Sequence, residues 1–214
     1  MTFKEGYILK ECKNKLVLHI GASAYVGYKK LVKNEPLLQQ KLNKIAKKAI
    51  GVDFDTNNIE ELKKEEITNI YFGDILKNTY DKEILKHKYE VIVFGNVIEH
   101  LDNLGLAMQN LKQFCNKNTK IIVITPNAWS LLRIMNMFMK NENVHKDHMF
   151  WPSKKTMNNI IKNDGFEIIE FKFGFYGEKR KYNIFKKIML HDFLGRLHKN
   201  IGPCLIYDLR LHKR

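Results

Sequence analysis

Cysteine is scarce in this chain of 214 residues, and none of it is paired along the sequence. Cys12, Cys115 and Cys204 are far apart, and no two of them form the CxxC pair typical of a zinc knuckle. An odd number of distant cysteines argues against a disulfide framework and is typical of reduced thiols in a cytosol. We therefore expect a cytoplasmic protein.

Long apolar runs are also missing. A membrane-crossing helix needs ~20 apolar residues, and the longest runs, such as LLRIMNMFM from Leu131, are far shorter. The first residues, MTFKEGYILKECKNKL, carry charges throughout, so we expect no secretory signal there. Repeats, proline-rich linkers and low-complexity tracts are absent as well, which predicts a single domain over residues 1–214.

Acidic residues are outnumbered, with 23 Asp and Glu against 37 Lys and Arg, and the net charge is +14. Such a charge attracts anionic partners, including nucleic acids, acidic membranes and nucleotide-linked sugars. Abundant Lys, Asn and Ile together also indicate an AT-rich genome, and we favour this compositional origin for most of the charge. The positive field would still help to recruit a phosphorylated substrate.

Short apolar runs alternate with segments of helical periodicity, which predicts an α/β fold. Two late runs with a long connection predict an antiparallel hairpin at one edge of the sheet. The earlier runs are nearly continuous and rich in β-branched residues, as in strands buried on both faces of a parallel sheet. The expected fold is a doubly wound, Rossmann-like, mostly parallel sheet of seven strands: Leu16–Ile20, Ala49–Val52, Ile70–Phe72, Val91–Phe94, Ile121–Ile124, Phe166–Phe173 and Pro203–Leu211.

Capping residues mark two of the expected helices. Asp102 or Asn103 precedes an apolar face that begins at Leu104, and Ser153 precedes another helix that Gly165 would end. Three further segments are expected: an N-terminal extension at 1–14, a loop at 141–152 beside the acceptor, and a basic amphipathic insertion at 175–200. For the insertion we favour a lid over the acceptor pocket; packing on a partner subunit and contact with an anionic membrane are alternatives.

Small or polar residues follow the first four strands, at the edge where ligands bind in such sheets. Gly21, Ala22 and Ser23 follow the first strand, and small residues let the backbone approach a ligand closely. Asp53 ends the second strand, where a carboxylate suits the two hydroxyls of a ribose. Asp74 ends the third, where it suits the amino group of adenine. The fourth runs into Asn96-Val-Ile-Glu99-His100.

With LHIGAS, AIGVDFD, YFGDI, VIVFGNVIEHL and KIIVITPN in this order, the chain resembles class I S-adenosylmethionine-dependent methyltransferases from about Lys15 to Leu211. The resemblance implies S-adenosylmethionine as cofactor and S-adenosylhomocysteine as product. It implies cofactor contacts as follows: Gly21, Ala22 and Ser23 at the methionine part, Asp53 at the ribose, Phe54 against adenine, Asp74 and Ile75 at the adenine edge, and Asn96 beside the sulfonium.

The chain departs from the family pattern at two positions. His19 stands where the family often has an acidic residue, and Ser23 stands where it often has a second glycine. The interval from Gly21 to Asp53 is also long, and Pro36 interrupts it. The segment LLQQKLNKIAKKAIGVDFD resembles bacterial enzymes that modify glycans, which implies a sugar acceptor.

Methyl transfer is an in-line displacement, in which the enzyme aligns the acceptor and, for a hydroxyl, removes a proton. We expect His148 to be the general base, with His100 as the second candidate; His100 would alternatively cap a helix, and His148 would alternatively anchor a turn. Glu99, His145 and Trp151 are expected to contact the acceptor. A metal ion held by His145, Asp147 and His148 is not expected, because all three lie in one short loop.

Other functions on the same fold remain to be compared. An NAD-dependent oxidoreductase would have G-x-G-x-x-G and an acidic residue ~20 positions later, but Asp53 comes 32 residues after Gly21. An RNA methyltransferase is an alternative suggested by the charge, although Asn96-Val-Ile-Glu99 does not match the motif that clamps a flipped base, and we expect no nucleic-acid partner. A non-catalytic cofactor-binding protein is another alternative. The interpretation we favour is O-methylation of a sugar or nucleotide-linked sugar in surface-glycan biosynthesis, with N-methylation of an amino sugar also open.

Overall fold

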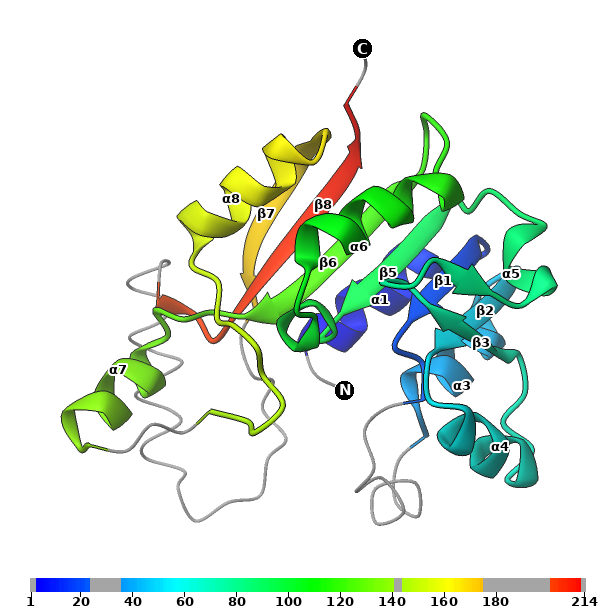
Figure 1. Ribbon diagram of the computed structural model, residues 1–214, viewed down its shortest axis with the longest axis horizontal. Coiled ribbons are helices and arrows are strands. Elements are labelled where there is room, and N and C mark those ends of the chain that lie inside the picture. Colours follow the sequence, from blue (N-terminus) through cyan, green and yellow to red (C-terminus); the bar gives the residue numbers. More distant parts are fainter. Residues whose placement is uncertain (1–2, 24–35, 141–143, 175–200, 213–214) are drawn as a thin grey trace.

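The computed structural model describes residues 3–23, 36–140, 144–174 and 201–212 of the chain. Its centre is a mixed sheet of eight strands in the order β4-β3-β2-β1-β5-β6-β8-β7 (Figure 1). The strands are β1 (Leu16–Ile20), β2 (Lys48–Asp53), β3 (Ile70–Asp74), β4 (Thr79–Tyr80), β5 (Val91–Gly95), β6 (Lys120–Pro126), β7 (Phe166–Gly174) and β8 (Cys204–Leu211).

The doubly wound α/β fold is confirmed, and all seven expected strands are present. Strands β1, β2, β3, β5 and β6 pair in parallel, and β8 pairs antiparallel with both β6 and β7. The expected count of seven was wrong by one, because the two-residue strand β4 pairs antiparallel with β3 after a tight turn. Asp74 Oδ1 accepts hydrogen bonds from the backbone amides of Leu76 and Lys77 in this turn. A strand of two residues has no alternation that a sequence pattern would reveal.

Strand order creates the place for a ligand. The chain moves outward from β1 through β2 to β3 and then returns to pair β5 with the other side of β1. The first described helices after these two strands, α3 (Leu38–Ile45) and α6 (Leu104–Leu111), lie on opposite faces of the sheet. Ligands of doubly wound sheets bind at such a switch point.

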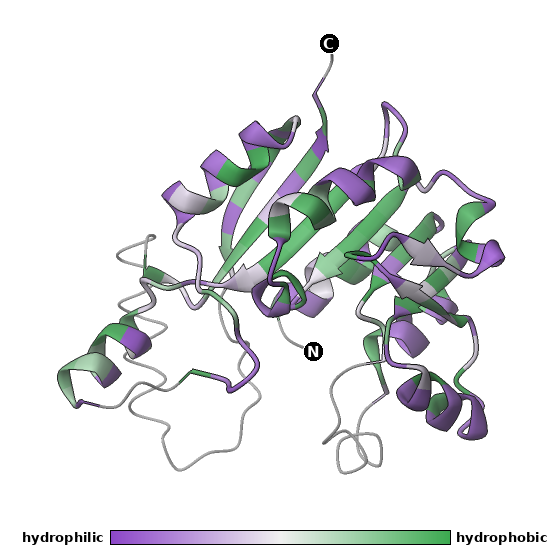
Figure 2. Cartoon of the chain, in the orientation of Figure 1, coloured by the Kyte–Doolittle hydropathy of each residue, from purple (hydrophilic) through white to green (hydrophobic). Residues whose placement is uncertain are grey.

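Helices cover both faces of the sheet (Figures 1 and 2). One face packs on α6 (Leu104–Leu111) and α8 (Lys154–Asn163), and the other packs on α1 (Phe3–Cys12) and α3 (Leu38–Ile45). The strands supply both layers by alternation: in β1, Leu18 belongs to the first core and Val17 to the second. The other helices within the described residues are α4 (Thr56–Lys64), α5 (Lys82–Leu85), α7 (Leu131–Phe138), η1 (Ile98–His100) and η2 (Lys112–Phe114).

The expected helix caps are present. The side chain of Asn103 accepts a hydrogen bond from the amide of Leu106 at the start of α6, and Ser153 does the same for Thr156 at the start of α8. Gly165 follows α8 with a φ of +79°, a conformation that ends helices and favours glycine.

The first residues form α1, which packs into the core through Ile8 and Cys12. Its Tyr7 hydroxyl donates a hydrogen bond to the buried carboxylate of Asp208 on β8. Lys120 on β6 bridges this carboxylate to Glu11 of α1, with Nζ to oxygen distances of 3.0 and 2.8 Å. The helix is therefore fixed to the middle of the sheet by both apolar and charged contacts.

Two earlier expectations concern parts of the chain that are only partly described. The basic segment 175–200, expected as a lid, lies outside the described residues, as do residues 141–143 of the acceptor-side loop. Among the helices that are described, none has the length and apolar character needed to cross a membrane.

Candidate active site

The loop after β1 lies against two neighbouring strand ends. Gly21 has a φ of +75°, and a Cβ atom at this position would lie 2.3 Å from Cγ2 of Val97. The amides of Gly21 and Ala22 both donate to the carbonyl of Val52, at 2.8 and 3.1 Å. Only glycine fits this left-handed backbone pressed against a neighbouring side chain, so Gly21 is fixed by geometry at the switch point.

Asp53, at the end of β2, has a carboxylate that organises this edge of the sheet. Oδ2 accepts a hydrogen bond from the amide of Ser23 at 3.0 Å, and Oδ1 accepts one from the amide of Asp55 at 3.1 Å. A carboxylate has about four acceptor sites, so each oxygen keeps one for a ligand hydroxyl. The next side chain, Phe54, is 72% exposed and offers a bare aromatic face beside the carboxylate.

Asp74 and Ile75 end β3 at the same edge of the sheet. Asp74 is occupied within its own turn, because Oδ1 accepts two backbone amides and Oδ2 lies 3.4 Å from the ammonium group of Lys77. The Ile75 side chain is buried, and its carbonyl accepts a hydrogen bond from the Asn110 side chain at 2.7 Å. Asp74 therefore keeps free hydrogen-bond acceptor capacity for a ligand only on Oδ2.

Asn96, directly after β5, has a φ of +56°, which asparagine tolerates better than most residues. Its amide donates to the carbonyl of Ile124, its Oδ1 accepts from Nζ of Lys4 at 2.7 Å, and its Nδ2 donates to Oε1 of Glu99 at 3.1 Å. Three groups thus hold one exposed side chain in a strained backbone conformation, as is common at functional sites.

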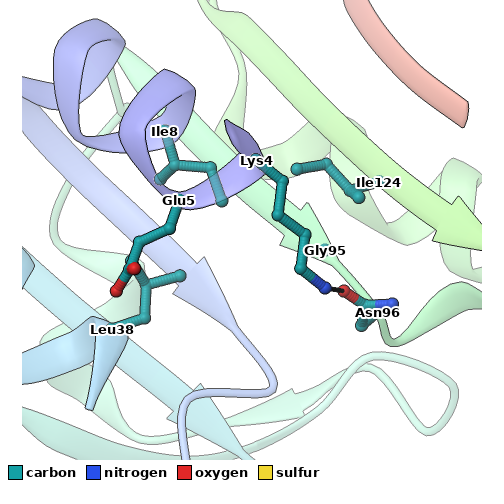
Figure 3. Close-up of a pocket in the computed structure, with 7 residues that line it drawn as sticks. All are labelled: Lys4, Glu5, Ile8, Leu38, Gly95, Asn96 and Ile124. Atoms are coloured by element: carbon teal, nitrogen blue, oxygen red, sulfur yellow. Dashed lines mark hydrogen bonds between the residues drawn. The ribbon is translucent and has the colours of Figure 1, made fainter. Parts of the chain in front are cut away.

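A pocket of about 290 Å³ opens beside Asn96 (Figure 3). It is lined by Lys4, Glu5 and Ile8 of α1, Leu38 of α3, Gly95 and Asn96 at the end of β5, and Ile124 of β6. The role of α1 in the pocket has no signal in the sequence, because the helix is short and its residues match no motif of the family.

Glu99 is almost completely buried beneath the site. Its carboxylate accepts hydrogen bonds from the side chains of Asn96 and Thr125, at 3.1 and 3.3 Å. Burial raises the pKa of this carboxyl above its usual range. Glu99 therefore positions Asn96 from below, and its side chain is too buried for the acceptor contact that the sequence suggested.

Loop 144–152 docks onto η1 and onto the segment that follows β6 through backbone hydrogen bonds. The amide of Met149 donates to the carbonyl of Glu99 at 2.8 Å, and the amide of Ala128 donates to the carbonyl of Pro152 at 3.1 Å. The ring of His100 adds a third connection, from Nδ1 to the carbonyl of Asp147 at 3.0 Å. These contacts fix the loop over the carboxyl ends of β5 and β6.

Docking of the loop brings together His100, His145, His148 and Trp151, all expected near the acceptor. The ring of His100 lies 4.7 Å from that of His148 and 5.9 Å from that of His145, between centroids. Trp151 donates from Nε1 to Nδ1 of His148 at 2.8 Å. The guanidinium group of Arg133 stacks 4.2 Å from the centre of the Trp151 ring.

His19 occupies a buried position on β1, where the family often has an acidic residue. Its Nδ1 lies 3.0 Å from Oε1 of Gln39, and because an amide oxygen only accepts, the ring donates from Nδ1. Burial lowers the pKa of His19, which keeps the ring uncharged at neutral pH. The buried His19 ring therefore has a hydrogen-bond partner from α3 inside the protein.

Comparison with known families and structures identifies this fold. A family described as a methyltransferase domain matches residues 27–171, which is more than half of the chain. An S-adenosylmethionine-dependent methyltransferase from Archaeoglobus fulgidus has a similar structure, with a TM-score of 0.57, 18% identity, and 95% of this chain and 90% of that one covered. Comparison with proteins of curated function gives no significant match.

Two further similar structures contain S-adenosylhomocysteine. The magnesium protoporphyrin IX methyltransferase from Synechocystis PCC 6803 has a TM-score of 0.60 at 12% identity, covering 98% of this chain and 82% of that one. The N-methyltransferase NodS from Bradyrhizobium japonicum WM9 has a TM-score of 0.58 at 13% identity, covering 98% and 86%. At such identities these similarities establish the fold, while their acceptors are too diverse to indicate the acceptor of this chain.

The strand-end residues also fit the cofactor of such enzymes. Gly21 keeps side-chain bulk away from the loop after β1, the Asp53 carboxylate retains acceptor sites, and Phe54 presents an uncovered aromatic ring. The chain therefore belongs to the methyltransferase-domain family, and its fold is that of S-adenosylmethionine-dependent methyltransferases.

Proposed function

We propose that the chain transfers the methyl group of S-adenosylmethionine to a hydroxyl group of a small acceptor, with a sugar or nucleotide-linked sugar of surface-glycan biosynthesis as the leading class. The observation that carries this proposal is the convergence of His100, His145 and His148 where loop 144–152 contacts η1, which follows the carboxyl end of β5. A sugar hydroxyl is a poor acid, so its methylation benefits from a nearby group that takes up the proton. We expect the reaction to take place in the cytoplasm.

The proposed cofactor contacts follow the strand ends. Gly21, Ala22 and Ser23 would surround the methionine part, and Asp53 would accept hydrogen bonds from the ribose hydroxyls. Adenine would pack on Phe54, with Asp74 Oδ2 and Ile75 at its polar edge. Asn96 would lie beside the sulfonium and, through its bonds to Lys4 and Glu99, keep one orientation.

Hydrogen bonding around the two candidate bases favours His100 over His148. The carbonyl of Asp147 accepts from Nδ1 of His100, so the lone pair of this neutral ring is on Nε2, ready to take a proton. Nδ1 of His148 instead accepts from Trp151, which puts the proton of that ring on Nε2. We therefore assign His100 as the general base and His148 as a hydrogen-bond donor to the acceptor oxygen.

Trp151 and Arg133 form the outer wall of the proposed acceptor site. One face of the indole is covered by the guanidinium group and its nitrogen is bonded to His148, so the side chain positions His148 rather than offering both faces to a sugar. The positive charge of Arg133 would favour an acceptor with a phosphate or diphosphate group. This environment supports a nucleotide-linked sugar within the acceptor class.

A methyl-transfer assay tests the proposal. Purified protein would be incubated with S-adenosylmethionine that is labelled in its methyl group and with a panel of nucleotide-linked sugars, sugars and amino sugars. Transfer to a hydroxyl is expected, and His100→Gln should reduce kcat by 10²–10⁴-fold, the usual contribution of a general base. His212→Gln, on an exposed ring outside the site, is the matched control. Label found only on an amino nitrogen, with no loss in His100→Gln, would refute O-methylation.

A further inference from the structure

Three imidazole rings from two separate segments meet at the acceptor side of the sheet. His100 comes from η1, and His145 and His148 come from loop 144–152. One ring nitrogen of each lies within 4.8 Å of the corresponding nitrogens of the other two. Across the described ranges of the chain, this is the one group of three or more metal-ligating side chains with such spacing.

The chemistry of this group suits a transition-metal ion. Imidazole is a preferred ligand of zinc, cobalt, nickel and copper, whereas magnesium and calcium prefer oxygen ligands. A zinc–nitrogen bond of about 2.05 Å in tetrahedral geometry puts ligand nitrogens about 3.4 Å apart. The rings would have to approach one another by at most about 1.4 Å. Rotation of the His145 and His148 side chains, which lie three residues apart in one loop, would supply this movement.

Surrounding groups orient two of the rings, and His100 is held as it would be in a metal site. The carbonyl of Asp147 accepts from Nδ1 of His100, which leaves Nε2 available to an ion. Asp147 Oδ2 is buried and has no hydrogen-bond partner among the described residues, and it lies 3.6 Å from Nδ1 of His145. Nδ1 of His145 also accepts a hydrogen bond from the amide of Asp147 at 3.4 Å, so this nitrogen carries the lone pair that an ion would bind. His145 is exposed, so the site is open to ions from solvent.

We propose that His100, His145 and His148 bind one divalent transition-metal ion, with zinc as the best fit, and leave a fourth position open to water or to the acceptor hydroxyl. The catalytic meaning of this site rests on the proposed function. A hydroxyl group bound to the ion loses its proton to solvent more readily, because the ion lowers its pKa. In this state Nε2 of His100 ligates the ion instead of taking the proton itself.

The hydrogen bond from Trp151 makes a distinctive prediction about affinity. While Nδ1 of His148 accepts from the indole, the proton of the neutral ring occupies Nε2, so neither nitrogen offers a lone pair to the ion. Metal binding at His148 therefore costs the indole hydrogen bond, whose net value is about 1 kcal/mol, or about fivefold in affinity. Trp151→Phe should bind zinc about fivefold more tightly than the wild type.

Calorimetric titration of the full chain with zinc chloride, repeated with magnesium chloride, tests the site. One equivalent of zinc should bind, magnesium should not, and cobalt should give the intense visible absorption of a tetrahedral site. His145→Ala should weaken zinc binding by at least tenfold, and His212→Gln, outside the cluster, should leave it unchanged. Circular dichroism of each variant would verify folding.

The outcomes separate this inference from the proposed function. Zinc binding that His145→Ala does not weaken, or that Trp151→Phe weakens, would overturn the site. If a hydroxyl acceptor is methylated and zinc does not bind, the metal site is wrong while the proposed function stands. If zinc binds as expected and no hydroxyl acceptor is methylated, the metal site stands and the proposed function fails.

Discussion

Replacing Gly21 by alanine would test the geometry on which the cofactor site depends. An alanine at a φ of +75° costs about 1–2 kcal/mol, because its Cβ crowds the following carbonyl. The same Cβ would lie 2.3 Å from Cγ2 of Val97, well inside the contact distance of about 3.5–4.0 Å. Relieving such a contact in a packed site costs about a further 1–3 kcal/mol. We expect a total near 3 kcal/mol and a fall in Tm of about 6–12 °C.

Urea unfolding of the wild type, Gly21→Ala, Val97→Ala and the double variant separates the backbone cost from the contact cost. In the double variant of this double-mutant cycle, the smaller side chain at position 97 makes room for the new Cβ, so the part of the destabilisation that comes from the contact should disappear. The part that comes from the backbone conformation of residue 21 should remain. Gly95→Ala is the matched control, because its Cβ would meet Ile124 at an ordinary 3.5 Å. A Gly21→Ala protein within about 0.5 kcal/mol of wild type would refute the reasoning, as would a cycle with no coupling between the two positions.

Three more predictions concern stability and cofactor binding. Burial lowers the pKa of His19, so below about pH 6.5 the unfolded chain binds a proton at this ring that the folded chain does not bind, and stability should fall. The urea midpoint of His19→Gln should depend less on pH in this range than that of the wild type. Asp208→Asn removes the charge that Tyr7 and Lys120 share and should lower the free energy of unfolding by about 2 kcal/mol, measured in urea. Phe54→Ala should weaken the binding of S-adenosylhomocysteine by about tenfold, and it should not lower Tm, because the ring is 72% exposed in the free protein. Equal affinity of variant and wild type would contradict packing of adenine on Phe54.

Much of the fold follows from local sequence signals. The strand β1 has the bounds that its apolar run predicts, and Asn103 and Ser153 cap the helices they were expected to cap. The two-residue strand β4 escaped prediction, because its pairing depends on a turn and not on hydrophobic alternation. The place of α1 in the core depends on contacts with β8 and β6 that are distant in the sequence.

The candidate site was less accessible to sequence reasoning than the fold. His100 and His148 are 48 residues apart, and their meeting depends on backbone hydrogen bonds between loop 144–152 and η1. Their tautomers depend on the carbonyl of Asp147 and the indole of Trp151, which no local pattern specifies. For this reason the preference for His148 as base, and the expectation that His145, Asp147 and His148 hold no metal ion, were both argued without the contact between the loop and His100.

Calorimetric titration with S-adenosylhomocysteine, comparing wild type with Asp53→Asn, tests the central claim most directly. Asparagine keeps the shape of the side chain, while it loses the charge and one of the acceptor oxygens that would bind the ribose hydroxyls. Loss of hydrogen bonds to a charged group costs about 1.5–3 kcal/mol, so the account predicts micromolar binding by the wild type and at least about tenfold weaker binding by the variant. Folded wild-type protein that does not bind S-adenosylhomocysteine, or a variant that binds it equally well, would contradict the account.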